Sequence, residues 1–248
     1  MNFRRTIRKI GENRYNTKKP NSVSDLVYPG TERIPYREYM AYKINEGGHD
    51  LVIESACAQG EHKTHDILRR KYDWEGRYVT INTGKPVEEY TDQPLFQADG
   101  DGMDPELLGK IVDTAAASRP VYAVNMAIGI MLSYFPERMG YESRRGDEAE
   151  ICVPLLEART DLWSRNMARS SLEVLFMSDY VADDSNHIEC QGTWRPVPNG
   201  LYGGLGGLNR SLMRLFSDRM VEFGWTVSEV EINNWPGPYT ESFFTFTR

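Results

Sequence analysis

The sequence predicts an α+β protein in which a mixed or antiparallel sheet carries helices on one face and continues into a C-terminal β-α-β extension. Residues 77–82 (RYVTIN) alternate as a strand should. Residues 208–223 form an amphipathic helical pattern, which Gly224 follows as a C-cap. Residues 226–232 and 242–247 then provide two final strands. Together these segments favour helices packed on a sheet.

The first half of the chain contains further candidate elements. Residues 11–35 are rich in Asn, Lys, Pro, Ser and Gly, which indicates an irregular segment. Residues 36–44 and 66–72 have helical patterns. Residues 51–58 are apolar and compact, and periodicity alone does not decide between a buried strand and the first turns of a helix.

The second half follows the same mixed pattern. A helix is expected to begin near Asp104, because proline at a first helical position and acids in the first turn suit a helix N-terminus. Residues 149–156 (AEICVPLL) are predicted to form a strand. Residues 172–181 and 187–194 are predicted to form a hairpin, and a glycine-rich loop is expected at residues 200–207.

These elements suggest three parts. Residues 1–35 are a basic, irregular N-terminal arm, residues 36–158 an α/β sandwich, and residues 159–248 a C-terminal α+β lobe. The boundary is placed near the charged run of residues 157–169, which separates two β-rich halves.

Composition excludes several classes of protein. Hydrophobic residues make up 40% and charged residues 26%, which is ordinary globular usage and excludes wholesale disorder. The longest weakly polar run, residues 120–135, is too short to span a bilayer. The three cysteines, Cys57, Cys152 and Cys190, form no C-x-x-C pair. With no signal segment at the start of the sequence, these features favour a cytoplasmic location.

Charge is distributed unevenly along the chain. Residues 1–20 carry a local net charge of +6, which leaves −13 for the remainder of a chain whose total is −7. Such an arm could contact a polyanion or an acidic patch on another protein subunit. A solvated terminal tail is the alternative interpretation.

Residues 98–108 (ADGDGMDPELL) place two glycines immediately before a predicted helix, so that the backbone can pass close to a ligand. This run resembles the first glycine box of the GHKL, or Bergerat-fold, ATPases. Glu54 then corresponds to the catalytic glutamate that this family carries on a helix. Residues 127–129 resemble a remnant of the second glycine box, and residues 140–155 resemble the strand pair that closes the family's sheet.

The resemblance implies an ATP-binding protein that uses Mg²⁺. Glu54 would be catalytic, and the implied nucleotide-binding residues are Asp99, Gly100, Gly102, Met103, Ser118 and Gly129. Two positions depart from the family's pattern. Ala58 stands where an asparagine would hold magnesium, and Ala98 stands where an aspartate would bind adenine. Because alanine provides no such ligand, the resemblance implies weak or absent hydrolysis.

The C-terminal part carries a second resemblance. The order of glycine-rich loop, helix, glycine and strand in residues 200–234 resembles the acetyl-CoA-binding core of GNAT acyltransferases. A glycine-rich loop before a helix N-terminus suits a pyrophosphate. However, Leu201 stands where that family's motif has Gln or Arg. An acyl-CoA-dependent acyltransferase is therefore an alternative function.

Three further interpretations remain open. Asp99, Asp101 and Asp104 could form a calcium loop, but Leu108 stands where such a loop needs an acid, and an acidic turn that caps the following helix explains them better. A structural zinc site could combine the cysteines and histidines of two distant segments: Cys57, His62, His65, His187 and Cys190. A non-catalytic structural or assembly protein would explain the two alanines most simply.

Overall fold

The computed structural model describes eight segments of the chain. These are residues 19–27, 34–55, 63–82, 96–99, 104–125, 148–182, 206–234 and 239–248. The N-terminal arm up to residue 18 lies outside them, so its contact with a polyanion or another subunit stays a prediction.

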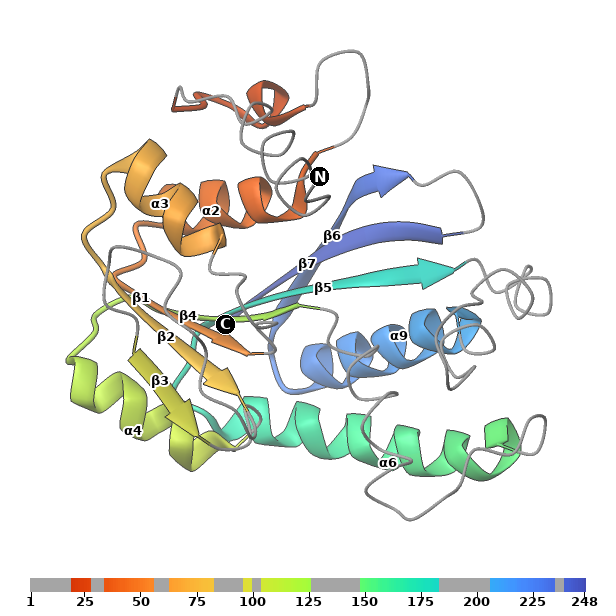
Figure 1. The fold of residues 1–248 in the computed structure, drawn as a ribbon. Helices are drawn as coiled ribbons and strands as arrows, with labels where there is room; N and C mark the ends of the chain where they lie inside the picture. Colours follow the sequence, from red (N-terminus) through yellow and green to blue (C-terminus); the bar gives the residue numbers. More distant parts are fainter. Residues whose placement is uncertain are drawn as a thin grey trace, which may run out of the picture.

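A seven-stranded sheet forms the centre of the molecule, with strand order β3-β2-β1-β4-β5-β7-β6 (Figure 1). The strands are β1 (Leu51–Ser55), β2 (Arg77–Asn82), β3 (Phe96–Asp99), β4 (Pro120–Asn125), β5 (Val174–Ala182), β6 (Thr226–Asn234) and β7 (Tyr239–Thr247). Neighbouring strands from β3 to β5 are parallel. Strand β7 is antiparallel to both β5 and β6. The sheet is therefore mixed, as the sequence predicts.

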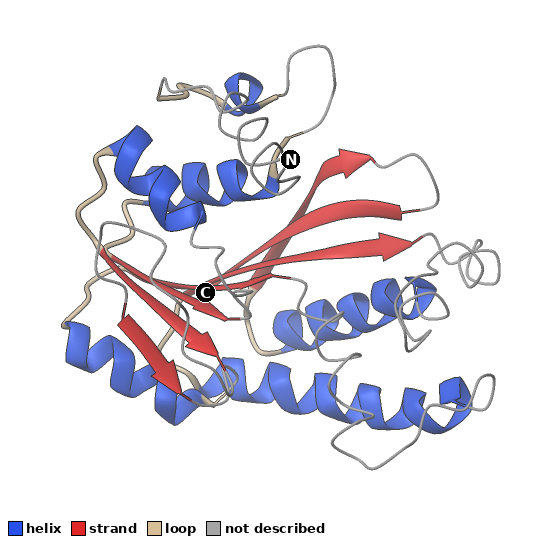
Figure 2. Ribbon diagram, in the orientation of Figure 1, coloured by secondary structure: helices blue, strands red, loops and turns tan. Residues whose placement is uncertain are grey.

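Helices cover both faces of this sheet (Figure 2). The described helical elements are η1 (Val23–Leu26), α2 (Tyr36–Gly47), α3 (Lys63–Tyr72), α4 (Pro105–Ala115), α6 (Glu148–Arg169) and α9 (Gly206–Glu222). Helices α2 and α3 lie on one face, and α4, α6 and α9 lie on the other. The expected α+β class with a mixed sheet is confirmed, and the helical cover extends to the second face.

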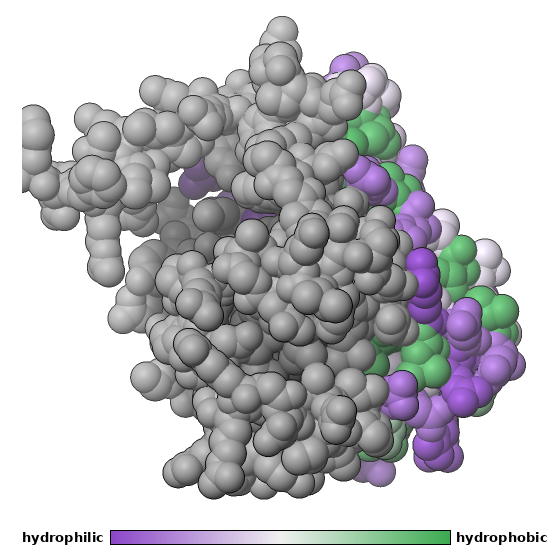
Figure 3. Space-filling model, turned by 90° about the vertical axis from the view of Figure 1, so that its right-hand side faces the viewer, coloured by the Kyte–Doolittle hydropathy of each residue, from purple (hydrophilic) through white to green (hydrophobic). Residues whose placement is uncertain are grey.

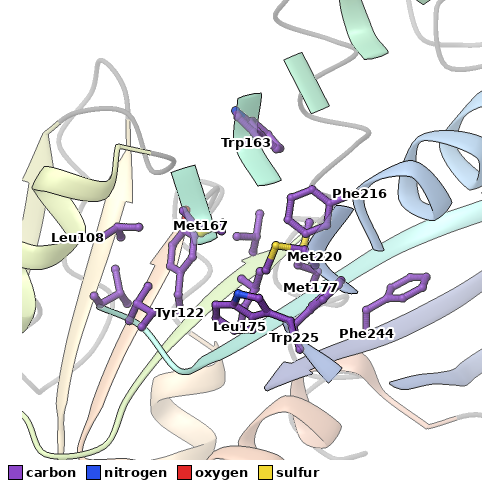
Figure 4. Packing of buried hydrophobic residues seen from close by; sticks show 14 of the residues in the cluster. Leu108, Tyr122, Trp163, Met167, Leu175, Met177, Phe216, Met220, Trp225 and Phe244 are labelled. Atoms are coloured by element: carbon purple, nitrogen blue, oxygen red, sulfur yellow. The ribbon is translucent and has the colours of Figure 1, made fainter. Parts of the chain in front are cut away.

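Two hydrophobic clusters fill the space between sheet and helices. Alternate residues of β1 face opposite ways, so that Ile53 belongs to the cluster under α4, α6 and α9, and Val52 to the cluster under α2 and α3. Figure 4 shows the first cluster, where Trp163 of α6 and Phe216 of α9 point toward side chains of the sheet. Because both faces of β1 are buried, its Leu-Val-Ile run is continuously apolar rather than alternating.

Several predicted elements are confirmed. Residues 77–82 form β2, residues 36–44 lie in α2, and α4 follows the N-cap Asp104 with Pro105 at its first position. Helix α9 is followed by Gly224, whose φ of 85° is the left-handed conformation expected of a C-cap. Of the predicted hairpin, residues 174–182 form β5. Residues 187–194 and the loop residues 200–205 lie outside the described segments.

One predicted strand is wrong. Residues 149–156 are helical and belong to α6. An apolar run of eight residues does not distinguish a strand from a buried helix, and Pro154 argued against a helix interior. The helix nevertheless runs through Pro154 and continues to Arg169. The strand pair that would close a GHKL sheet is therefore not formed by these residues.

The sheet crosses the boundary that the sequence suggests near residue 158. Strand β4 precedes that boundary and β5 follows it, and the two pair in parallel from Tyr122↔Leu175 to Asn125↔Ser178. The charged run of residues 157–169 lies within α6. Among the described helices, none combines the length and the apolar character needed to cross a membrane.

Candidate functional site at the carboxyl ends of the parallel strands

The strand order reverses direction beside β1. From β1 the chain passes through α3 to β2 and then to β3 on one side, and α4 leads it back to β4 on the other side of β1. The two connections lie on opposite faces of the sheet (Figure 1). In open α/β sheets, ligands bind outside the carboxyl ends of the strands at such a topological switch point. The carboxyl ends of β1 and β4 are therefore the candidate site.

Acidic and amide residues stand where the first four strands end. Glu54 is the penultimate residue of β1, and β2, β3 and β4 end at Asn82, Asp99 and Asn125. Asn82 and Asp99 are register partners on neighbouring strands. The last two residues of each of these four strands include no lysine or arginine. The residue types at the ends of these four strands are thus acidic or amide.

Glu54 lies inside a buried polar cluster. Its side chain is only 1% exposed, and its Oε2 accepts a hydrogen bond of 2.6 Å from the Tyr78 hydroxyl. Tyr78 pairs in register with Val52, so its hydroxyl reaches two residues further along β1 to meet the carboxylate. A distance of 2.6 Å is typical of a hydroxyl that donates to a carboxylate.

The first turn of α3 covers this cluster. The His65 ring lies 5.2 Å from the Tyr78 ring, measured between centroids, and Thr64 precedes it in the same turn. Thr80 on β2 is the register partner of Glu54. Both threonines are fully or almost fully buried, and their hydroxyls have no hydrogen-bond partner among the residues that the structure describes.

The structure separates the predicted site residues. Glu54 and Asp99 both lie near the carboxyl edge, on β1 and β3. Ser118 lies at the opposite, amino edge, where its backbone N–H and its hydroxyl both donate to Asp50 Oδ2 at 2.8 Å. Gly100, Gly102, Met103 and Gly129 lie outside the described segments. Ser118 therefore does not share a site with Glu54.

The amino edge is a structural clamp. Arg119 N–H donates to Asp50 Oδ1 at 2.9 Å, beside the two bonds from Ser118. Burial on its own would raise the pKa of Asp50, but these hydrogen bonds outweigh it and hold that pKa below its ordinary value. The neighbouring His49 ring donates from Nδ1 to the Arg119 carbonyl, and burial lowers its pKa. These contacts tie the start of β1 to the start of β4.

The metal interpretations find no support among the described residues, which contain no group of three potential metal ligands. Asp104 caps α4 by accepting a hydrogen bond from the Glu106 N–H at 2.9 Å, as the helix-capping interpretation expects. His65 packs against Tyr78 and Trp74. The other four residues of the zinc hypothesis, and Asp101 of the calcium hypothesis, lie outside the described segments.

The resemblance to GHKL ATPases is wrong, and with it the expectation of ATP and Mg²⁺. Glu54 lies on a strand rather than on a helix, and residues 149–156 form a helix rather than a closing strand. The GNAT resemblance is also wrong, because α9 comes between β5 and β6 in the chain and β6 is the edge strand of the same seven-stranded sheet. An assembly protein without a ligand site is no longer the simplest interpretation of this fold.

Sequence reasoning missed Tyr78, Thr80, Asn82 and Asn125. Each polar strand end directly follows an apolar strand residue, which is the available sequence signal for the carboxyl edge of a parallel sheet. That signal becomes useful only when the strands are known to be parallel and adjacent.

Comparisons with known proteins find similarity among solved structures alone. No family model matches the chain, and no curated protein matches it. Among solved structures, the N-methyltransferase NodS from Bradyrhizobium japonicum WM9 is 12% identical with a TM-score of 0.43, covering 85% of this chain and 93% of its own. The O-methyltransferase from Bacillus cereus in complex with S-adenosylhomocysteine (SAH) is 9% identical with a TM-score of 0.46, covering 98% and 88%. The SAH-bound methyltransferase from Podospora anserina is 9% identical with a TM-score of 0.47, covering 100% and 96%.

Proposed function

We propose that this chain is a methyltransferase that binds S-adenosylmethionine at the carboxyl ends of β1 to β4. The observation that carries the proposal is the reversal of strand order beside β1, at an edge where the strands end in acidic and amide residues. A doubly wound sheet of this kind binds nucleoside cofactors at its switch point.

The residues at this edge fit a nucleoside cofactor without phosphates. A pyrophosphate requires a glycine-rich turn between β1 and the following helix. Residues 56–62 contain a single glycine, Gly60, and include Glu61. Glu54 adds a second carboxylate directly before this segment. Polyphosphate ligands such as ATP or a dinucleotide would be repelled by the negative charge here. They would also lack the glycine-rich turn that binds their phosphates.

S-adenosylmethionine has the complementary chemistry. It carries a positively charged sulfonium, an ammonium group and a carboxylate, and its adenine and ribose have donors whose hydrogen bonds carboxylate and amide oxygens can accept. By sequence, Glu54 and Asp99 are carboxylate residues and Asn82 and Asn125 are amide residues, which are the residue types suited to these donors and to the ammonium group. When bound, the cofactor supplies an electrophilic methyl group. The chain's own contribution is to bind and orient it at the edge of the sheet.

The relatives in fold named above are methyltransferases, and two of their structures contain SAH. Because the identities are 12% or less and the TM-scores are below 0.5, the activity and the bound SAH are properties of those proteins alone. For this chain, the proposal rests on the strand order and on the residues at the strand ends.

Calorimetric titration of the full chain with S-adenosylmethionine and with SAH tests the proposal. Both should bind, whereas ATP with Mg²⁺ and NAD should not. At a concentration one hundred times its dissociation constant, SAH should stabilise the fold by about 2.7 kcal/mol. Absence of binding by both adenosyl compounds would refute the proposal.

A pair of variants locates the site. Asp99→Ala should weaken SAH binding by about tenfold or more, because one hydrogen bond to a charged group is lost. Ser118→Ala changes a side chain at the opposite edge and should leave the affinity unchanged. Equal effects of the two substitutions would place the ligand elsewhere.

A further inference from the structure

We infer that Tyr78 is a positioning residue of the cofactor site, whose hydroxyl holds the Glu54 carboxylate where it binds the α-ammonium group of S-adenosylmethionine. The inference rests on the proposed function and extends it to a specific pair of side chains. Tyr78 itself is the second residue of β2, away from the carboxyl strand ends that would meet the ligand.

The position of Glu54 connects the buried cluster to the ligand edge. Only Ser55 separates Glu54 from residues 56–62, which link β1 to α3 at the switch point. The residues that follow this segment, Thr64 and His65 in the first turn of α3, pack over the same cluster. Residues of this cluster therefore come shortly before and shortly after residues 56–62 in the chain.

The hydrogen bond from Tyr78 restricts the carboxylate to one orientation. The Tyr78 hydroxyl donates to Oε2 at 2.6 Å, and the Tyr78 side chain is 2% exposed, so that neither group can rotate freely. A held carboxylate loses little rotational freedom when a cation binds to it, and this preorganisation increases affinity.

Two buried hydroxyls give a second, independent indication of a ligand-facing polar region. Thr80 is 1% exposed and Thr64 is fully buried, and neither hydroxyl has a hydrogen-bond partner among the described residues. A buried hydroxyl without a partner is costly. Thr80 is the register partner of Glu54, so the two residues are neighbours on adjacent strands.

The test compares two adenosyl probes. SAH contains adenine, ribose, a thioether and an amino-acid part with one ammonium and one carboxylate group, whereas 5′-methylthioadenosine lacks the amino-acid part. Tyr78→Phe removes the hydroxyl and keeps the buried ring. We expect Tyr78→Phe and Glu54→Gln each to weaken SAH binding by about 10- to 100-fold and to change 5′-methylthioadenosine binding by less than about twofold.

Tyr122→Phe is the matched control. Tyr122 is a fully buried tyrosine on β4 that belongs to the cluster on the opposite face of the sheet. Its substitution should leave the affinities for both probes unchanged. Thermal unfolding of each variant without ligand measures any loss of stability separately from the loss of affinity.

The possible results separate the inference from the proposed function. If the parent chain binds neither probe, the proposed function fails and this inference fails with it. If the parent binds SAH and Tyr78→Phe binds it equally well, the function stands and the role of Tyr78 is refuted. Equal weakening of both probes by Tyr78→Phe would show that Tyr78 only supports the fold, and would also overturn the inference.

Discussion

Single residues in unusual backbone conformations show where this sequence departs from local preference. Ala116 follows α4 with φ of 48° and ψ of 42°, and its N–H donates to the carbonyls of Val112 and Asp113. Glycine is the usual residue at this position, because a Cβ is strained in the left-handed region. Because the methyl group of Ala116 is exposed, its removal costs the protein no packing contacts.

Ala116→Gly should raise the free energy of unfolding by about 0.5–1 kcal/mol. Ala115→Gly, in the last residue of α4, should lower it by about 0.5–1 kcal/mol, because glycine is unfavourable in a helix. Urea-induced unfolding of both variants measures the difference. A loss of stability in both variants would contradict the left-handed conformation of Ala116.

Asp50 predicts a specific pH dependence. Its pKa is held below the ordinary value in the folded protein, so its contribution to stability is present above the unfolded-state pKa of about 4 and is lost as pH falls through the folded-state pKa. At pH 7, Asp50→Asn should cost about 1–3 kcal/mol, because the amide cannot accept all three hydrogen bonds from Ser118 and Arg119.

The cost of Asp50→Asn should shrink as pH falls below about 4 toward the lowered folded-state pKa of Asp50, where the aspartate itself takes up a proton. Urea unfolding of the parent and the variant across this range gives the measurement. A difference that stays constant with pH would show that the charge of Asp50 is not responsible.

At the scale of elements, the sequence predicts a helix or strand correctly where the local residue pattern agrees with the packing of that segment in the fold. Residues 208–223 have a helical period and end before Gly224, and α9 follows both signals. In residues 149–156 the local pattern and the fold disagree. Their apolar pattern and interior proline disfavour a helix locally, yet these residues belong to α6. Burial of both faces of β1 likewise removed the alternation that would have identified a strand.

A buried ion pair joins two elements on one face of the sheet. Lys71 of α3 donates from Nζ to Glu38 Oε1 of α2 at 2.7 Å, and the two side chains are 9% and 5% exposed. Breaking a buried pair leaves an uncompensated charge, whereas removing both partners costs far less. This asymmetry makes the pair testable by a double-mutant cycle.

Lys71→Met should lower the free energy of unfolding by about 3–5 kcal/mol, because the Glu38 carboxylate remains buried without its partner. Adding Glu38→Leu should recover most of that loss. Denaturant unfolding of the two single variants and the double variant provides the cycle. Simple addition of the two single losses would show that the pair does not couple α2 to α3.

For the whole molecule, the sequence suggests candidate polar residues but cannot show which of them meet. Glu54 and Asp99 were both predicted as site residues, and both lie near the carboxyl edge of the sheet. Ser118 was predicted with them and lies at the other edge. The difference depends on which strands pair and in which direction. That information is contained in contacts between distant segments rather than in local pattern.

The surface gives less information than the core. On the face drawn in Figure 3, the described surface mixes hydrophilic and hydrophobic residues, and no broad apolar patch is visible on that described part. Larger exposed apolar side chains among the described residues include Leu162, Val221, Phe223 and Val230. These single residues are ordinary for a folded protein.

The continuous sheet predicts how the molecule unfolds. Sequence alone suggested separate parts on either side of residue 158, and a chain of 248 residues is long enough for two domains. In the structure, β4 and β5 pair across that position, and one hydrophobic cluster contains Leu51 and Tyr122 from the first part with Phe216 from the second. Loss of either part would expose the core of the other.

We therefore expect thermal unfolding to occur in one cooperative transition. Far-UV circular dichroism and tryptophan fluorescence should give the same midpoint, because Trp74 lies in the first part and Trp163 and Trp225 lie in the second. A fragment of residues 1–158 should not fold by itself, since its β4 would lose β5 and the cover of α9. Two separate transitions, with Trp74→Phe removing the fluorescence change of only one, would instead support two independent parts.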